Sequence, residues 1–458
     1  MKPLRWLIAL VLLLGAGVGV YVATRPTVRF ITGLAPIGLD EAVFVTRRNT
    51  DDDTRYWLQL SGADGAVRWS VSTGDHTVVN NLGATAIGAD ADAVYGFEEP
   101  GRVAPASATR LVARARSDGE VVWETAMDPL PDRTLMIGDG AVRVDAARVY
   151  VSRELPGGPV LDAFARSDGR REWSSATADA RGAALYPLGP ERLAVLAHGG
   201  SCTIVNRTSG GSEVLDWTFP LGAVPSGVAV AQQGDAVVFT PGGERVAFHP
   251  PNGARVEPRG PVGERDGQLI VGVRVGATNT VGLVAFARDT QAVTWSLDLG
   301  ATLFSELTAD GGPLPRLLPV TLYGDPKREG VVQELAVVDL DRGAIVARYD
   351  TNGAHATSLV AAGRPWIWLG FDTLVALDPE TGAIATATRF DSASLMGTDI
   401  RPEDLRFGQL WIPGAGHAAP SDLPFAVVDL HTGAVSQLNG AVTSQDVTVA
   451  VRAALAPR

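Results

Sequence analysis

The segment Leu111-Val-Ala-Arg-Ala-Arg-Ser-Asp-Gly-Glu-Val-Val-Trp123 returns later in the chain as Leu161-Asp-Ala-Phe-Ala-Arg-Ser-Asp-Gly-Arg-Arg-Glu-Trp173. Both copies place Ser-Asp-Gly between two alternating runs, with a tryptophan four residues after the glycine. Alternation of apolar and polar residues is typical of strands, and Asp-Gly between two such runs is typical of a tight turn. Each copy therefore predicts a β-hairpin, and the recurrence predicts a repeat architecture.

Seven further copies of this turn occur along the 458-residue chain. Three of them keep the tryptophan, at Trp69, Trp217 and Trp295. The copy that ends at Trp295 replaces the turn glycine with Gln291. Four copies keep the turn without the tryptophan, at Gly253, Gly343, Gly382 and Gly433, and the one at Gly253 is the most distorted. A period of about 40–50 residues with β-type alternation is typical of propeller blades.

One repeat near the C-terminus shows how a blade is built. The apolar run Thr373–Leu377 leads into Asp378-Pro-Glu-Thr-Gly382, in which Asp accepts backbone N–H groups and Gly takes the left-handed conformation. A second strand returns over Ala383–Arg389, and another strand, Pro365–Leu369, precedes the pair. With a less regular innermost strand, each period makes a four-stranded blade. The tail Val442–Val451 is interpreted as a strand that completes the first blade and closes the ring.

The repeat Val375-Ala-Leu-Asp-Pro-Glu-Thr-Gly382 resembles the pyrroloquinoline-quinone (PQQ)-like repeat, found in quinoprotein alcohol dehydrogenases and in the outer-membrane-protein assembly scaffold lipoprotein. The resemblance implies that the repeat tryptophans dock between adjacent blades, here Trp69, Trp123, Trp173, Trp217 and Trp295. It also favours eight blades. We therefore expect an all-β fold, a single propeller of about eight four-stranded blades (seven to nine fit the motifs), over residues 30–458. A shared fold says little about activity.

A quinone cofactor is the obvious possibility raised by this resemblance. The enzymes of the group bind it with a calcium ion, and the alcohol dehydrogenases stack it on a disulfide of adjacent cysteines. This chain has a single cysteine, Cys202, and no compact acidic cluster that could be assigned to calcium. We predict no cofactor, no metal site and no catalytic residue. The alternatives are a quinoprotein or metal-dependent enzyme using the central channel, or a propeller that binds a small ligand or carbohydrate.

The side chains that could carry chemistry have plainer interpretations. Asp51-Asp-Asp53 is interpreted as a hairpin tip, because three consecutive carboxylates cannot all converge on one ion. Asp90 and Asp92 are interpreted as a turn entering a strand, and Cys202 as a buried strand residue. No histidine lies at metal-ligand spacing from another His or Cys; the six are His76, His198, His249, His355, His417 and His431.

Three tryptophans lie outside the turn motif. Trp366 and Trp368 alternate on one strand and point to one face, and Trp411 occupies the equivalent strand one blade later. Packing between blades is the favoured interpretation. The alternative is an exposed aromatic platform for a peptide or sugar.

The N-terminal segment, residues 1–29, contains eighteen uncharged positions from Trp6 to Ala23, preceded by Lys2 and Arg5. This run is just long enough to cross a bilayer as one transmembrane helix. An uncleaved anchor is the favoured interpretation, and a cleaved signal peptide with a weak site near Gly17-Val-Gly19 is the alternative. Either one places the propeller outside the cytoplasm, periplasmic or at the cell surface, and secreted if the segment is cleaved.

Charge and loop composition narrow the functional classes. The net charge of −12 and the absence of a Lys/Arg run argue against nucleic-acid binding. We therefore predict a non-catalytic binding and scaffolding propeller whose partners are other envelope proteins. Contacts are expected on loops that are longer than plain turns, namely Glu99–Thr109, Ala309–Pro319, Tyr323–Gly330 and Gly414–Leu423.

Overall fold

The computed structural model describes the chain from residue 30 to residue 455 with gaps. The described residues are 30–49, 54–74, 88–98, 110–127, 142–155, 157–178, 184–197, 201–215, 218–225, 227–258, 260–304, 307–324, 333–351, 353–370, 372–390, 405, 407–413, 425–439 and 442–455. The predicted anchor at residues 1–29 lies outside them. Within these ranges no helix is long and apolar enough to span a membrane.

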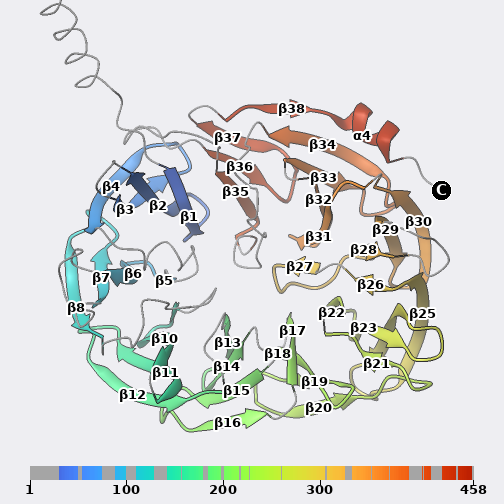
Figure 1. Ribbon diagram of the computed structural model, residues 1–458, viewed down its shortest axis with the longest axis horizontal. Helices are drawn as coiled ribbons and strands as arrows, with labels where there is room; N and C mark the ends of the chain where they lie inside the picture. The colour runs from blue at the N-terminus through green and yellow to red at the C-terminus, as the bar shows by residue number, and fades with distance from the viewer. Residues whose placement is uncertain are drawn as a thin grey trace, which may run out of the picture.

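Nine sheets follow one another around a ring and form nine blades, with the first strand of a blade toward the centre and the last on the rim (Figure 1). The first five blades are β1 (Phe30–Pro36), β2 (Glu41–Asn49), β3 (Thr54–Gly62), β4 (Val67–Gly74); β5 (Gly88–Ala89), β6 (Ala93–Glu98), β7 (Arg110–Ala115), β8 (Val121–Ala126); β9 (Val142–Val144), β10 (Arg148–Leu155), β11 (Gly158–Ala165), β12 (Arg171–Ala176); β13 (Ala184–Leu188), β14 (Arg192–Ala197), β15 (Ser201–Asn206), β16 (Ser212–Leu215); and β17 (Thr218–Val224), β18 (Gly227–Gln232), β19 (Asp235–Phe239), β20 (Arg245–Phe248).

The last four blades differ from one another: the sixth and eighth have additional strands, and the ninth has three described strands. Their strands are β21 (Arg255–Val256), β22 (Val262–Arg265), β23 (Gln268–Val275), β24 (Thr280–Ala287), β25 (Val293–Ala301); β26 (Leu303–Phe304), β28 (Leu317–Tyr323), β29 (Gln333–Asp339), β30 (Ala344–Asp350); β31 (Ala356–Ala361), β32 (Arg364–Leu369), β33 (Thr373–Leu377), β34 (Ile384–Phe390); and β35 (Gln409–Pro413), β36 (Phe425–Asp429), β37 (Val435–Asn439). In the sixth blade β21 and β22 both pair with β23. In the eighth, β27 (Leu307–Ala309) joins the inner edge in parallel, and β38 (Ser444–Asp446) joins the outer edge.

Nine blades lie within the predicted range of seven to nine, one more than the favoured number of eight. The number of turn motifs matches the number of blades, but the copy at Gly253 is not the turn of its blade. The fifth blade turns between β19 and β20, where Thr240 N–H and Gly243 N–H form the turn bonds and Gly243 has φ of +79°. Gly253 lies after β20, in the link to the sixth blade. Pro-Pro-Asn-Gly suits a connecting turn equally well, so sequence alone misplaced the hairpin.

The tail also differs from the prediction, because it does not complete the first blade. Asp446 pairs with Thr388 on the outer edge of the eighth blade, and α4 (Thr448–Ala454) follows. Val447, Val451 and Leu455 recur at helical spacing and are buried together with side chains of the seventh and eighth blades. The segment therefore lies across the outer edges of the seventh and eighth blades, and we call it the C-terminal strap.

The ring closes through side chains instead. Phe44 of the first blade lies with its ring centroid 6.2 Å from that of Trp411 and 5.4 Å from that of Phe425, both in the ninth blade. Ala42 and Val427 complete this buried cluster. Edge-to-face and tilted aromatic contacts of this kind stabilise a seam beyond the area that they bury.

The repeat tryptophans dock between blades, as the resemblance implied. Trp69 Nε1 donates to the carbonyl of Arg116 (3.0 Å), Trp123 Nε1 to that of Arg166 (2.8 Å), and Trp173 Nε1 to that of Arg207 (3.2 Å), each in the next blade. A Cβ built on the turn glycine of that blade would collide with the indole ring, as Gly119 does with Trp69 at 2.8 Å. Trp295 packs likewise against Gly343, while Trp217 lies outside the described residues.

Candidate functional site

Two sets of turns lie at one face of the disc, because strands alternate in direction. The turn that joins the first strand of a blade to the second, and the turn that joins the third to the fourth, share this face, which we call the turn face. The connections from second to third strand and from blade to blade lie at the opposite face, which we call the loop face. Charged side chains of the turn face connect successive blades.

The clearest of these connections lies between the second and third blades. Asp90 Oδ1 accepts the backbone N–H groups of Asp92 (2.8 Å) and Ala93 (2.9 Å), and its Oδ2 accepts from Tyr95 Oη (2.7 Å). Arg166, from the outer turn of the third blade, places Nε 2.6 Å from Asp90 Oδ2 and Nη2 2.5 Å from Asp92 Oδ2. We call this arrangement an interblade clamp.

Burial alone would raise the pKa of the Asp90 carboxyl. The hydrogen bonds from Tyr95 and the two backbone N–H groups, together with the charge of Arg166, outweigh it and hold the pKa below its ordinary value. Burial and the bond to Asp90 raise the pKa of Tyr95 above its ordinary value. These groups are fixed as an ionised carboxylate and a neutral phenol, which is a structural role and not that of a poised acid or base.

The same clamp recurs between the third and fourth blades. Asp145 Oδ1 accepts from the backbone of Ala147 (2.7 Å) and Arg148 (2.8 Å), and its Oδ2 accepts from Tyr150 Oη (2.8 Å) and from Arg207 Nη2. Arg207 Nη1 also donates to the carbonyl of a turn in its own blade. Despite burial, which acts in the opposite direction, these bonds hold the pKa of Asp145 below its ordinary value.

Simpler pairs continue the series at other blade boundaries. Between the first and second blades, Glu41 Oε2 lies 2.7 Å from Arg116 Nη2, so the acid again comes from the inner turn and the arginine from the outer turn. Between the sixth and seventh blades the polarity is reversed, because Arg265 Nε of the inner turn lies 2.8 Å from Asp341 Oδ1 of the outer turn. The reversal shows that the connection itself, and not one charge pattern, is maintained.

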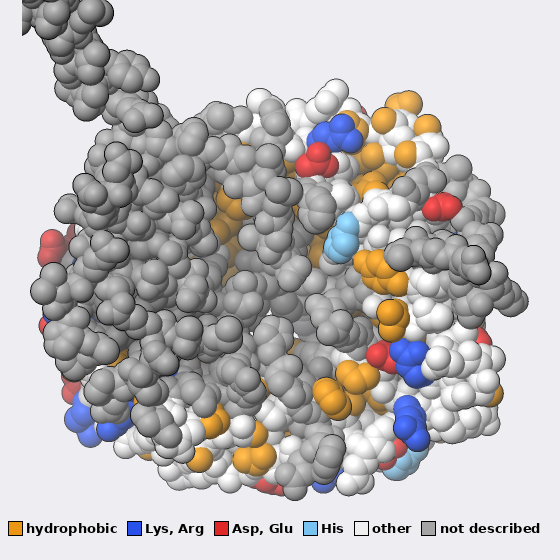
Figure 2. All heavy atoms as spheres, viewed as in Figure 1, with side chains coloured by type: hydrophobic (Ala, Val, Ile, Leu, Met, Phe, Trp, Pro, Cys, Tyr) orange, Lys and Arg blue, Asp and Glu red, His pale blue; other side chains and the backbone are white. Residues whose placement is uncertain are grey.

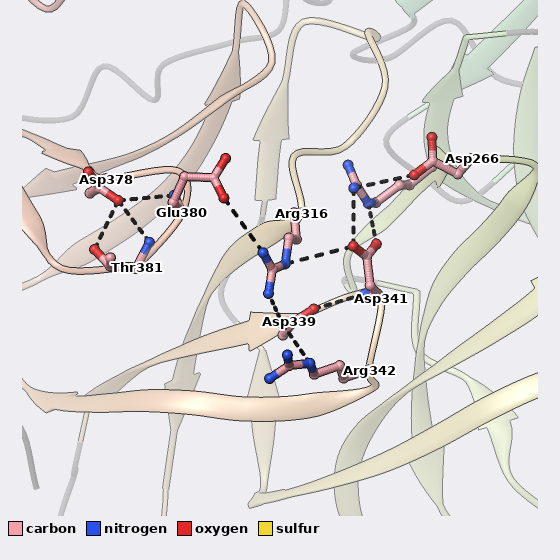
Figure 3. Close-up of polar contacts among 9 residues, drawn as sticks. Asp266, Arg316, Asp339, Asp341, Arg342, Asp378, Glu380 and Thr381 are labelled. Carbon is pink, nitrogen blue, oxygen red and sulfur yellow. Dashed lines mark hydrogen bonds and ion pairs between the residues drawn. The ribbon is translucent and has the colours of Figure 1, made fainter.

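Arg316 makes the most branched of these connections (Figure 3). Its Nη2 donates to the buried Asp339 (2.9 Å), its Nε lies 3.7 Å from Asp341, and its Nη1 lies 3.6 Å from Glu380 of the eighth blade. Although burial acts in the opposite direction, the Arg316 hydrogen bond and charge hold the pKa of Asp339 below its ordinary value. Arg316 therefore joins the seventh and eighth blades through carboxylates of both.

Three of the clamp arginines recur at one position of the repeat, although they were not interpreted from sequence. Arg116 and Arg166 occupy the same place in Ala-Arg-Ser-Asp-Gly, and Arg207 takes it in a third copy. Arg288 takes it in a fourth copy but pairs with Glu264 of its own blade. A charged residue that recurs at one position of a repeat was the available signal. Asp90, which we interpreted as a turn residue, is indeed in a turn and also anchors the clamp.

The other candidate residues occupy separate places. The Asp51–Asp53 run and His76, His198 and His417 lie outside the described residues. His249, His355 and His431 lie in different blades, and across the described ranges no three His, Cys, Asp or Glu side chains are grouped so that they could hold a metal ion. Cys202 is buried in β15, and burial raises the pKa of its thiol to about 12.

The packing interpretation of the remaining tryptophans is confirmed. Trp366 and Trp368 are buried in one cluster with side chains of the ninth blade, and Trp411 is buried at the closing seam. None of these three rings forms an exposed platform.

One of the expected contact loops, Ala309–Pro319, has contacts within the ring. Leu314 is buried, and its N–H donates to the carbonyl of Glu264 in the sixth blade (2.8 Å). Asp310 Oδ2 accepts from Ala362 N–H in the eighth blade (2.8 Å). The segment before β28 therefore ties three blades together. The other loops fall wholly or mostly outside the described residues.

No family model matches the chain, and no curated protein matches it in sequence. Similar solved structures include BamB from Moraxella catarrhalis (11% identity, TM-score 0.38, 80% of this chain and 90% of that one). They also include a quinohemoprotein alcohol dehydrogenase from Pseudomonas putida HK5 (10%, 0.32, 76% and 72%) and the C-terminal WD40 domain of Sif2 (9%, 0.39, 77% and 99%). These structures are only distantly similar to this chain. The nine-bladed ring is assigned from the sheets described above and not from this similarity.

Proposed function

We propose that this protein is a non-catalytic binding and scaffolding propeller that holds other envelope proteins on its loop face. The observation that carries the proposal is where the long segments leave the ring. Residues 99–109 connect β6 to β7, residues 325–332 connect β28 to β29, and residues 414–424 connect β35 to β36. The first two of these join a second strand to a third. In the three-stranded ninth blade the outer turn lies between β36 and β37, so β35 and β36 correspond to the second and third strands of the other blades. All three connections therefore start and end at the loop face.

The turn face supports this division of roles. Its charged side chains are engaged in clamps such as Asp90–Arg166 and Arg316–Glu380, which hold successive blades in place. A rigid disc fixes the ends of the loops and lowers the entropy lost when a partner binds. On the face drawn in Figure 2 the described acidic, basic and hydrophobic side chains are interspersed, and no block of one charge stands out among them.

The apolar segment Trp6–Ala23 supports a location at a membrane, with the propeller on the extracytoplasmic side. A reporter fused after residue 458, active only outside the cytoplasm, is expected to be active. Activity of a cytoplasm-specific reporter at the same place would contradict this part of the proposal.

Site-specific photocrosslinking in cells tests the partner claim. A photoreactive residue is placed at Ala104, Lys327 or Ala418 in the three segments, and at the exposed Thr290 in the outer turn of the sixth blade, on the turn face, as the matched control. The expected result is one shared crosslinked protein from at least two loop positions and none from Thr290. Equal capture at Thr290, or no capture at any position, would contradict the proposal.

A further inference from the structure

A depression of about 510 Å³ lies on the turn face between the second and third blades. Its lining includes Ala93, Tyr95, Val122 and Trp123 of the second blade, with Asp92 and Arg166 at the clamp. Depressions of a few hundred Å³ with apolar walls and a few polar groups are typical of ligand sites. The question is which side chains leave this boundary open.

The other blades supply the comparison. In the first, second, third and sixth blades two positions meet at this place. They are the first residue of the strand that follows the inner turn, and the bulged residue just before the tryptophan on the outer strand. In three blades both positions carry polar side chains that contact each other: Glu41–Arg68 (3.9 Å), Arg148–Glu172 (2.6 Å) and Gln268–Thr294 (3.0 Å). A bonded polar pair therefore fills this place in those blades.

The second blade has Ala93 and Val122 at the two positions. Neither side chain can make a polar contact, and Ala93 is too short to fill the space that Arg148 fills one blade later. Val122 is left 58% exposed. The seventh blade also has apolar side chains at these two positions, Leu317 and Val346, of which Leu317 is larger than Ala93. In the second blade an exposed β-branched side chain beside an alanine-lined depression leaves an apolar surface.

The charge at the rim is negative. The guanidinium of Arg166 is shared between Asp90 and Asp92, so two carboxylates face one cation. The side chain of Asp92 is 78% exposed, and it can accept a second cation from solvent. A ligand that complements this site has an apolar group for Val122 and Ala93, with a positive charge beside it.

We propose that the depression binds a short peptide motif of a partner, an apolar side chain followed by Lys or Arg, with the cation beside Asp92. This inference rests on the proposed binding function and adds a second contact point on the turn face. It assigns the specificity of that contact to Ala93, Val122 and Asp92.

The test uses full-length protein labelled with 5-fluorotryptophan, in which the Trp123 resonance is assigned by Trp123→Phe. Three blocked hexapeptides are titrated: acetyl-Gly-Gly-Leu-Lys-Gly-Gly-amide and its Leu→Ser and Lys→Glu versions. We expect a saturable shift of the Trp123 signal with the first peptide. The Lys→Glu peptide is expected to bind about fivefold more weakly, the effect of one exposed ion pair, and the Leu→Ser peptide not to shift the signal.

The double variant Ala93→Arg with Val122→Glu reproduces the Arg148–Glu172 pair and should close the depression without loss of thermal stability. It is expected to abolish the peptide-induced shift. Should that variant unfold, Asp92→Asn provides the second test, with about fivefold weaker binding of the lysine peptide only. No saturable shift, or an equal shift in the closed variant, would overturn the inference. In that case crosslinking from the loop positions would still support the proposed function. Failure of the crosslinking experiment would overturn the proposed function independently of the peptide titration.

Discussion

Arg166 Nε of the third blade lies 2.6 Å from Asp90 Oδ2 of the second, and Trp123 of the second blade donates to the carbonyl of that same Arg166. Arg166 therefore contacts the second blade twice. Its backbone carbonyl accepts a hydrogen bond from Trp123, and its guanidinium forms an ion pair with Asp90. Adjacent blades are held by both contacts, in addition to their apolar faces.

Arg166→Ala should lower stability more than a typical surface change. The substitution leaves Asp90 partly buried and still ionised, with its charge uncompensated, so we expect a loss of about 1–3 kcal/mol. Arg170→Ala, an exposed arginine in the same turn, is the control and should change stability by less than about 0.5 kcal/mol. Thermal unfolding of both variants measures the difference, and equal effects would show that the clamp contributes nothing.

Acid should weaken the clamps in a defined range of pH. Asp90 and Asp145 have folded-state pKa values below their ordinary value of 3.8, so their contribution is present above that value and is lost as the pH falls through the lower folded-state pKa. The double variant Asp90→Asn with Asp145→Asn should be less stable than the wild type at pH 7. The gap between the two melting temperatures should narrow as the pH falls below about 4. A difference in melting temperature that stays constant down to pH 2 would refute the assignment of Asp90 and Asp145 as ionised members of the clamps.

Gly119→Ala should separate two costs of a turn substitution. Gly119 has φ of +78°, and a Cβ there would lie 2.8 Å from the Trp69 ring, whereas Gly253 has φ of +69° and open space around it. Gly253→Ala is expected to cost about 1–2 kcal/mol, the left-handed strain alone. Gly119→Ala should cost about 1–3 kcal/mol more, because the indole must move. Equal losses would mean that tryptophan docking is not tight.

Removal of residues 442–458 should expose a strand edge. The tail bonds the outer edge of β34 along its length: Arg452 donates to the carbonyls of Ile384 and Ala385, and Thr448 Oγ1 accepts from Ala387 N–H. Unpaired edges promote association, so the truncated protein is expected to melt earlier and to self-associate in sedimentation experiments. Val449→Ser, at a residue that is 82% exposed, is the control. A truncated protein that stays monomeric with an unchanged melting temperature would contradict the strap role.

Local chemistry made the hairpins predictable. At Asp378–Gly382 the carboxylate accepts the N–H groups of Glu380 and Thr381, and Gly382 has φ of +71°, as the motif indicated. Where a turn breaks the rule, the backbone keeps its shape: Gln291 replaces glycine and still has φ of +58°. The nine turns could therefore be counted from the sequence, although one was misplaced.

Features that depend on distant residues could not be predicted in the same way. The Val-rich tail alternates like a strand, but Val447 and Val451 pack against the rim as parts of a helix, because tertiary contacts override β propensity. The partner of Arg166 lies 74 to 76 residues earlier in the chain, in another blade. The open depression depends on Ala93 and Val122, which are 29 residues apart in the sequence and meet only in the folded blade.

The central claim is that the loops of the loop face make the main contact with the partner, while the disc provides rigidity. It is tested most directly by the Kd of the crosslinked partner for a variant in which Gly414–Leu423 is replaced with a short Gly-Ser link, measured together with Tm. The account predicts a Kd raised by about tenfold or more, with Tm unchanged within about 2 °C. An unchanged Kd, or weaker binding that appears only with a collapse of Tm, would contradict it.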